Sequence, residues 1–276
     1  MTKKTSLGAK LYTALVYIFL YAPIVVLIIF SFNSGKSTSV FEGFSLKWYG
    51  ELFNDSVTLE AFKNSMIVAV ISSLIATVMG TAAATAVFNY KNRHLRAAVM
   101  TVTNIPMMNP EIVTGISMML LFVFIGAIFG KTGNLGFTTL IIAHTTFELP
   151  YVILNVLPKL KQTDPHLAEA AQDLGCTPLQ AFFKVVLPAI VPGIISGAMM
   201  AFTLSVDDFI ISYFVSGTSS QTLPIRIFSM TKRRVTPDMY ALSTLIFLAI
   251  LVLLVASNVI SARGDKKLAK KKGGVK

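Results

Sequence analysis

The stretch TDPHLAEAAQDLGCTPLQAFFKVVLP, residues Thr163–Pro188, lies between two long apolar segments of the chain. Asp164 is a good N-cap residue, and the proline after it suits the first turn of a helix because its missing N–H is not needed there. Gly175 suits the left-handed conformation that ends a helix, and Thr177, again followed by proline, repeats the cap for a second helix. The stretch therefore predicts a helix–turn–helix that joins two apolar spans.

The composition outside this stretch is that of a membrane protein. Of the 276 residues, 54% are hydrophobic and only 13% are charged, with a mean hydropathy of +0.70, whereas soluble domains carry about a quarter charged residues. A bilayer core needs about 20 apolar residues in a helix. Six stretches meet this length, so the predicted fold is an all-α, multi-pass bundle of six transmembrane helices. They lie near residues 11–32, 66–88, 108–129, 136–157, 184–214 and 240–262.

The basic residues predict the orientation of these spans. The net charge of +11 is spread between and after the apolar runs, which favours a topological role over binding to nucleic acid. With six spans, sixteen Lys and Arg residues fall on the side of both termini and eight on the other side. The positive-inside rule places the side with sixteen in the cytoplasm. This predicts a cytoplasmic N-terminus at 1–10, a membrane domain at 11–262 and a basic cytoplasmic tail at 263–276.

Several classes of chemistry are disfavoured by what the sequence lacks. A single cysteine, Cys176, cannot form an internal disulfide, and no Cys/His cluster suggests a metal site. The chain has no Gly-rich phosphate-binding loop followed by Lys-Ser/Thr. It also shows no nucleophile–base–acid set. We therefore expect a chain that is no enzyme, with neither a catalytic residue nor a bound cofactor of its own.

Four acidic residues fall within or at the edge of predicted spans: Glu111, Glu148, Asp207 and Asp208. Unpaired charge in a membrane is costly, so such residues commonly face a cavity or a transport path. Glu111 follows Pro110 at a span start, where the helix dipole favours an acid without any transport role. Asp207 and Asp208 point about 100° apart on a helix, so one of them is expected to face a path. The other would bond a serine or meet a neighbouring helix, and Asp207 is the favoured path residue.

Three further features leave alternatives open. Glu148 follows His144 by four residues, so the two share a helix face and can simply pair. The only tryptophan, Trp48, lies just after the first span, where it can anchor the interface or contact an ammonium group through its ring. The fifth span carries prolines and glycines near its start, from Pro188 to Gly197, which predicts a kinked or broken helix.

The 163–188 stretch carries a resemblance to a known family. The segment Glu169-Ala170-Ala171, then Gly175, and Leu187-Pro188 at the end resemble the EAA loop of ABC importer permeases. Segments elsewhere resemble more narrowly the PotC-type permeases of spermidine/putrescine importers, which belong to the MetI-like type I fold. These segments are Lys47-Trp48-Tyr49, Asn109-Pro110-Glu111, Ser205-Val206-Asp207-Asp208 and Leu223-Pro224-Ile225-Arg226.

This resemblance implies a function and a set of partners. Residues 163–183 would be a cytoplasmic coupling loop, in which Glu169, Ala170, Ala171, Gly175, Leu187 and Pro188 couple to an ATPase dimer that binds ATP and Mg²⁺. A second permease and an external polyamine-binding protein would complete an importer in a bacterial cell membrane. Trp48, Glu111, Asp207 and Asp208 would line the substrate path. The alternatives are a permease of the same superfamily for another cation or small solute, and an ion-coupled secondary transporter.

Overall fold

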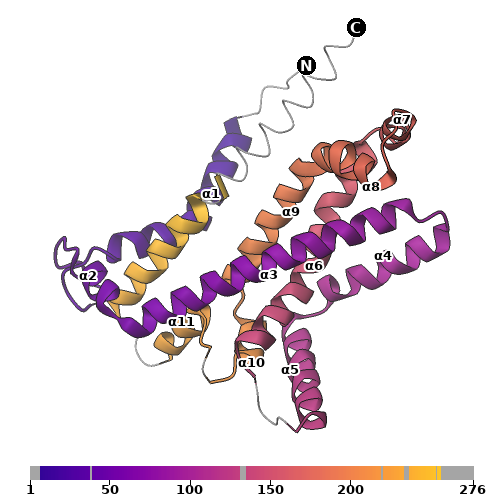
Figure 1. Ribbon diagram of the computed structural model, residues 1–276. Coiled ribbons are helices and arrows are strands. Elements are labelled where there is room, and N and C mark those ends of the chain that lie inside the picture. Colours follow the sequence, from indigo (N-terminus) through magenta and orange to yellow (C-terminus); the bar gives the residue numbers. More distant parts are fainter. Residues whose placement is uncertain are drawn as a thin grey trace. The chain divides into compact units, whose positions relative to one another are not determined.

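The computed structural model describes residues 7–37, 39–130, 135–218, 220–232, 236–252 and 254–255. The chain divides into two compact units, one of Met1–Leu59 with Ile227–Val252 and one of Glu60–Arg226 with Leu253–Lys276. The described residues are overwhelmingly helical (Figure 1). The predicted all-α fold is therefore confirmed, whereas the predicted domain limits at 10, 262 and 263 stay predictions.

The first unit contains α1 (Leu7–Phe30), α2 (Lys47–Asn54) and a short apolar helix, Pro237–Val252. The loop between α1 and α2 is organised by the buried side chain of Asn33. Its Nδ2 donates to the Ser37 and Val40 carbonyls, and its Oδ1 accepts from the Glu42 N–H. One side chain thus satisfies backbone groups that no helix pairs.

The second unit carries the residues on which the functional prediction depends. α6 (Phe137–Gln162) and α9 (Leu187–Asp207) pack along each other, and α10 (Ile210–Val215) packs on α5 (Glu111–Ile128). The remaining helical elements, some in part, are α3 (Ser56–Asn89), α4 (Arg93–Met108), α7 (Leu167–Asp173), α8 (Pro178–Ala181), the π-helical turn Phe182–Val186 and α11 (Leu223–Thr231). Within this unit, α7 and α8 lie at one end of α9 and α10 at the other (Figure 1).

Glycines allow the central helices to approach closely. A Cβ at Gly80 of α3 would come within 2.7 Å of Val152 on α6. A Cβ at Gly193 of α9 would come within 2.6 Å of the Lys159 side chain on α6. Small residues at such crossings are typical of helix packing in membranes, where close backbone approach supplies the van der Waals contact. The sequence thus specifies a tight core around α6.

Among the described residues, five helices have the length and composition of membrane spans: Leu7–Phe30, Ser56–Asn89, Glu111–Ile128, Phe137–Gln162 and Pro178–Asp207. They correspond to the first five predicted spans. The sixth is described as the shorter apolar helix Pro237–Val252, and the predicted end of this span near 262 lies outside the described residues. The segment after the second span forms α4.

The predicted fifth span, 184–214, is a broken helix, as expected. From Leu187 to Asp207 the helix is continuous; Pro188 falls in its first turn, and Pro192, inside the helix, has no N–H to donate. The backbone departs from regular α-helix just before Leu187, in the π-helical turn, and breaks at Asp208, whose φ and ψ are −65° and 121°. Gly193 and Gly197 serve contact with α6.

Candidate functional site

The predicted helix–turn–helix is present between α6 and α9. Asp164 closes the turn before α7, since its Oδ1 accepts from the His166 N–H at 3.0 Å. Gly175 has a φ of +88°, as a left-handed terminator requires. Thr177 and Gln180 form a reciprocal capping box at the start of α8. The loop therefore has a defined conformation and leads directly into the fifth span.

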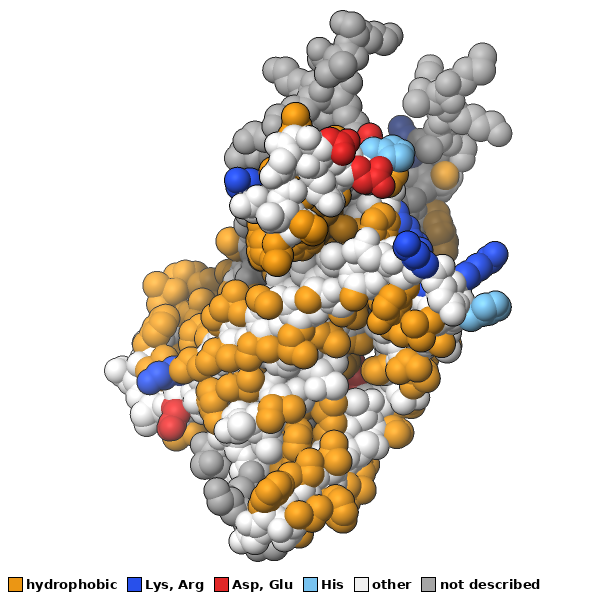
Figure 2. Space-filling model, turned by 45° about the vertical axis from the view of Figure 1, so that its right-hand side comes forward, with side chains coloured by type: hydrophobic (Ala, Val, Ile, Leu, Met, Phe, Trp, Pro, Cys, Tyr) orange, Lys and Arg blue, Asp and Glu red, His pale blue; other side chains and the backbone are white. Residues whose placement is uncertain are grey.

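The outer surface of this loop combines charged and large apolar groups. Glu169 is exposed and its Oε2 lies 3.0 Å from His166 Nδ1. The apolar side chains of Leu174 and Leu179 are 87% and 69% exposed, and Phe183 is 58% exposed. Figure 2 shows acidic and histidine side chains gathered at one end of the molecular face that it presents. Apolar residues exposed on a polar loop are typical of a surface that binds another protein.

The residues predicted to couple to an ATPase occupy two environments. Glu169, Ala170 and Gly175 are exposed, whereas Ala171 is buried against the rest of the loop. Leu187 is half-buried at the start of α9, and Pro188 beside it is exposed. Outward-facing residues are thus available for contact, while Ala171 and Leu187 attach the loop to its own bundle.

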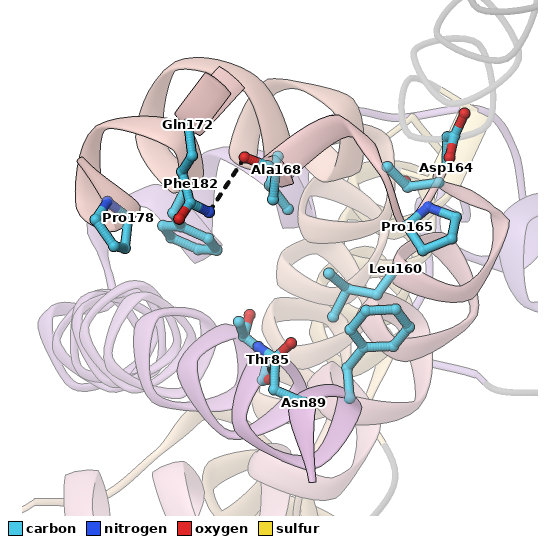
Figure 3. A pocket seen from close by; sticks show the side chains of 12 residues that line it. Thr85, Asn89, Leu160, Asp164, Pro165, Ala168, Gln172, Pro178 and Phe182 are labelled. Carbon is cyan, nitrogen blue, oxygen red and sulfur yellow. Dashed lines mark hydrogen bonds between the residues drawn. The ribbon is translucent and has the colours of Figure 1, made fainter. Parts of the chain in front are cut away.

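A cavity of about 320 Å³ lies beneath the loop (Figure 3). Thr85 and Asn89 of α3 form one wall, and Gln172, Pro178 and Phe182 face them across the space. Gln172 Nε2 donates to the Ala168 carbonyl within α7, at 3.2 Å. The cavity lies between this part of the loop and the end of α3.

At the other end of α9, Asp208 stabilises the helix break. Its Oδ1 accepts from the Ile211 N–H at 3.2 Å, and its Oδ2 accepts from the Ser212 N–H at 2.7 Å. Its side chain is only 3% exposed. A carboxylate that accepts two backbone N–H groups at a helix start acts as a cap. We call the interruption at Asp208 and Phe209 the α9–α10 break.

Asp207 is exposed, in contrast to its neighbour. Within the described parts of the chain, its carboxylate has no hydrogen bond or ion pair. Glu111 is also exposed, at the first position of α5. Gly115, one turn after Glu111, packs against Ile210 and Ile211 just after the break. The α5–α10 contact therefore brings two exposed carboxylates to the same region of the second unit.

A buried polar network lies directly behind the break. His144 Nδ1 is 2.7 Å from Ser205 Oγ, and its Nε2 is 2.9 Å from Ser212 Oγ and 3.5 Å from Asp208 Oδ2. Ser72 donates to Glu148 Oε1 at 2.7 Å and lies 3.2 Å from Ser205 Oγ. The spacing of His144 and Glu148 predicted that the two can pair, and His144 Nδ1 lies 4.0 Å from Glu148 Oε1. Serine hydroxyls also connect them, and Ser72 is a member that sequence reasoning missed.

Trp48 is placed in the first unit, where its side chain has a structural partner. It is 5% exposed, and its Nε1 donates to the Asn33 carbonyl at 2.6 Å. Lys47 Nζ lies 5.3 Å from the centre of its ring. The predicted contact with an ammonium group of a substrate stays a prediction, and it would require this buried ring to become accessible.

The chain is similar in sequence to a known transport family and to permease proteins. Residues 76–270 match the family described as binding-protein-dependent transport system inner membrane component. The putrescine transport system permease protein PotI of Escherichia coli K12 is 38% identical over 251 residues, which cover 91% of this chain and 89% of that protein. The spermidine/putrescine transport system permease protein PotC of Haemophilus influenzae is 38% identical over 250 residues, covering 91% and 95%.

A solved structure supports the fold. A chain of a bacterial alginate ABC transporter, solved in complex with an alginate pentasaccharide-bound periplasmic protein, matches with a TM-score of 0.71 at 18% identity. The match covers 93% of this chain and 94% of that one. Together with the apolar helices and the loop before the fifth span, these similarities identify the class. This chain belongs to the family of inner membrane components of binding-protein-dependent transport systems, and it is a membrane-embedded transport subunit rather than an enzyme.

Proposed function

We propose that this chain is one permease subunit of an ATP-driven importer and that its substrate is a polyamine such as putrescine or spermidine. The observation that carries this proposal is the exposed pair of carboxylates at Glu111 and Asp207, which have no cationic side chain bound to them in the described parts of the chain. A transported cation with several ammonium groups needs compensating negative charge in a medium of low dielectric constant. The names of the two relatives at 38% identity agree with this substrate class.

The coupling loop supplies the proposed connection to ATP hydrolysis. Its exposed leucines, its exposed Phe183 and its acidic turn suit a groove on a cytoplasmic ATPase dimer. The ATPase would bind ATP and Mg²⁺, because this chain contains no phosphate-binding loop of its own. A second permease would supply the other half of the path, and an extracellular or periplasmic protein would deliver the substrate. No cofactor is assigned to this chain.

The proposed orientation places both termini and the coupling loop in the cytoplasm of a bacterial cell. The distribution of Lys and Arg supports it, with sixteen on that side and eight on the other. Cys176 lies within the loop and is partly exposed. In inverted and right-side-out vesicles, a membrane-impermeant maleimide should label Cys176 only in the inverted ones. Labelling in right-side-out vesicles alone would reverse the orientation.

Uptake by cells tests the substrate assignment. Deletion of this gene should abolish ATP-dependent uptake of radiolabelled putrescine or spermidine, and expression of the chain from a plasmid should restore it. Unlabelled polyamines should compete with the label, whereas an amino acid or an anionic sugar should not. Unchanged polyamine uptake in the deletion strain, in the absence of other polyamine transporters, would contradict the proposal and would favour another solute.

A further inference from the structure

The imidazole of His144 binds both sides of the α9–α10 break. Its Nδ1 contacts Ser205 in the last turn of α9, at 2.7 Å, and its Nε2 contacts Ser212 in α10, at 2.9 Å. The ring is 2% exposed and belongs to α6. A single side chain of the central helix therefore holds the two helix segments that the break separates.

Hydroxyl groups connect Glu148 to His144. Ser72 donates its one hydroxyl hydrogen to Glu148 Oε1 at 2.7 Å. Ser205 Oγ lies 3.2 Å from Ser72 Oγ and 2.7 Å from His144 Nδ1. Glu148 thus reaches one edge of the His144 ring through two serines, and these contacts restrain the orientation of the ring.

The opposite edge of the same ring faces the cap. His144 Nε2 lies 3.5 Å from Asp208 Oδ2, the oxygen that accepts from the Ser212 N–H at 2.7 Å. A ring held in one orientation therefore restrains the carboxylate that begins α10. Asp207 precedes this carboxylate in the chain and is exposed. Its direction depends on the backbone conformation that the cap stabilises.

Burial makes such a network expensive. Glu148 is 0% exposed, and its Oε2 has no hydrogen-bond partner. Burying a carboxylate with one oxygen unsatisfied costs free energy that an apolar residue would not cost. A network of this kind can specify one conformation where apolar packing would permit several. The titratable groups that face one another in it are Glu148 and His144 of α6 and Asp208 of the break.

We infer that His144, oriented by Glu148 through Ser72 and Ser205, is a positioning residue that holds the α9–α10 break and thereby sets the direction of the Asp207 carboxylate. The inference deepens the proposed function, on which it rests in so far as Asp207 contacts the transported cation. His144, Glu148, Ser72 and Ser205 would then act on the path from a buried position, without contact with the substrate.

The test uses the complete importer, reconstituted in proteoliposomes with its ATPase, second permease and binding protein. Ser72→Ala removes the hydroxyl that connects Glu148 to Ser205. It should raise the KM for polyamine uptake about three- to tenfold, the effect of one lost buried hydrogen bond, with Vmax within about twofold of wild type. Ser73→Ala is the matched control, because that hydroxyl donates only to Val70 of its own helix.

Paired substitutions separate positioning from packing. Glu148→Gln keeps an acceptor for Ser72 and should retain a KM within about twofold of wild type, whereas Glu148→Leu removes the acceptor and should behave like Ser72→Ala. His144→Asn should retain a group near Ser205 and His144→Gln one near Ser212, and each should raise the KM. A role in packing alone would reduce the amount of assembled complex and leave the KM unchanged in all of these variants.

Hydrogen exchange of the break provides a readout that needs no substrate. In the same complex, the amides of Ile211 and Ser212 should exchange faster in Ser72→Ala and Glu148→Leu than in wild type or Ser73→Ala. Unchanged exchange would overturn the inference, and faster exchange with an unchanged KM would overturn the link to Asp207. If the wild-type complex transports no polyamine, the proposed function fails, and hydrogen exchange still tests whether the network holds the break.

Discussion

Adjacent aspartates at the end of the fifth span differ completely in their surroundings. Asp208 accepts two backbone N–H groups and is buried, whereas Asp207 is exposed. The separation of about 100° between neighbours on a helix predicted that only one of them would face a path. The break between α9 and α10 accentuates this difference, because the second aspartate becomes a cap.

Asp207→Asn should weaken polyamine uptake without changing the stability of the protein. The substitution removes an exposed charge that has no partner in the described chain, so folding loses little. A cation in the path would lose one compensating charge, and uptake kinetics in proteoliposomes should show a KM raised roughly tenfold. Asp173→Asn on α7, also exposed, is the control. Unchanged kinetics would remove Asp207 from the path.

Asp208→Asn should instead destabilise the protein. The carboxylate accepts from the Ile211 and Ser212 N–H groups with two different oxygens, and in asparagine one of these oxygens is replaced by an NH2 group that would face a backbone N–H. The cost should be about 1–3 kcal/mol. It should be visible as a lower midpoint of thermal unfolding in detergent than that of Asp207→Asn. Equal midpoints for the two variants would contradict the capping role.

His166 on the coupling loop should titrate above the ordinary range. The hydrogen bond that His166 donates to the Glu169 carboxylate, with smaller contributions from the charges of Glu169 and Asp164, raises the pKa of His166. Because the raised pKa belongs to the folded state, the stabilisation is complete below the ordinary pKa of about 6.5. It is lost as the pH rises through the raised value. NMR titration should show this shift, and Glu169→Gln should reduce it; an unshifted His166 in the wild-type protein would contradict the pairing.

At the level of residues, sequence reasoning found the acids but not all of their partners. The four-residue spacing of His144 and Glu148 predicted that they share a face. It could not reveal Ser72, which is 76 positions from Glu148 in the chain, because only the packing of α3 on α6 brings them together. Trp48 shows the same limit, since its partner Asn33 belongs to an irregular loop.

At the scale of helices, the sequence predicted the positions of the spans better than the positions of their breaks and close contacts. Glycines and prolines near the start of the fifth span predicted a kinked or broken helix, and the break falls beyond them, at Asp208. Pro188 lies in the first turn of α9, and Gly193 accommodates Lys159 and Asn155 of α6. Proline and glycine therefore indicate special positions, but whether they mark a bend or a contact depends on the neighbouring helix.

Gly193→Leu should separate α6 from α9 and destabilise the bundle. Even a Cβ there would lie 2.6 Å from Lys159 Cγ and 3.1 Å from the Asn155 carbonyl oxygen. Overpacking of this kind costs about 1–3 kcal/mol or more, measurable as a lower midpoint of thermal unfolding in detergent. Gly8→Leu in α1 is a suitable control, because a Cβ there meets nothing within 4 Å. Equal stability of the two variants would contradict the close α6–α9 packing.

Gly175→Ala should disturb the coupling loop through its backbone alone. No atom lies within 4 Å of a Cβ at this position, but the φ of +88° is strained for alanine. The expected cost is about 1–2 kcal/mol. Faster hydrogen exchange of the α7 amides should reveal it, and Gly50→Ala in α2, with open space and no unusual φ, should be neutral. Unchanged exchange in α7 would contradict a structural role for the left-handed turn.

Across the second unit, α9 connects the two proposed functional regions. The coupling loop enters it through α8 and the π-helical turn, and the α9–α10 break ends it. At about 1.5 Å per residue, its 21 residues span about 30 Å. A displacement of the loop can therefore reach the acidic residues through one continuous helix. The order of the coupling loop, the fifth span and its acidic end could be predicted from the sequence, because apolar runs and helix caps are local signals.

We propose that this chain couples ATP hydrolysis by the partner ATPase dimer to the movement of a polyamine. The most direct measurement compares both rates in proteoliposomes that contain the complete importer with wild-type chain or with Glu169→Lys. The exposed Glu169 carboxylate contributes to no packing within the bundle, so the variant should insert and assemble normally, as should Glu60→Lys on α3. We expect ATP-dependent polyamine accumulation with the wild-type chain and with Glu60→Lys. With Glu169→Lys we expect ATP hydrolysis without polyamine accumulation. Equal accumulation per ATP hydrolysed with Glu169→Lys would contradict it.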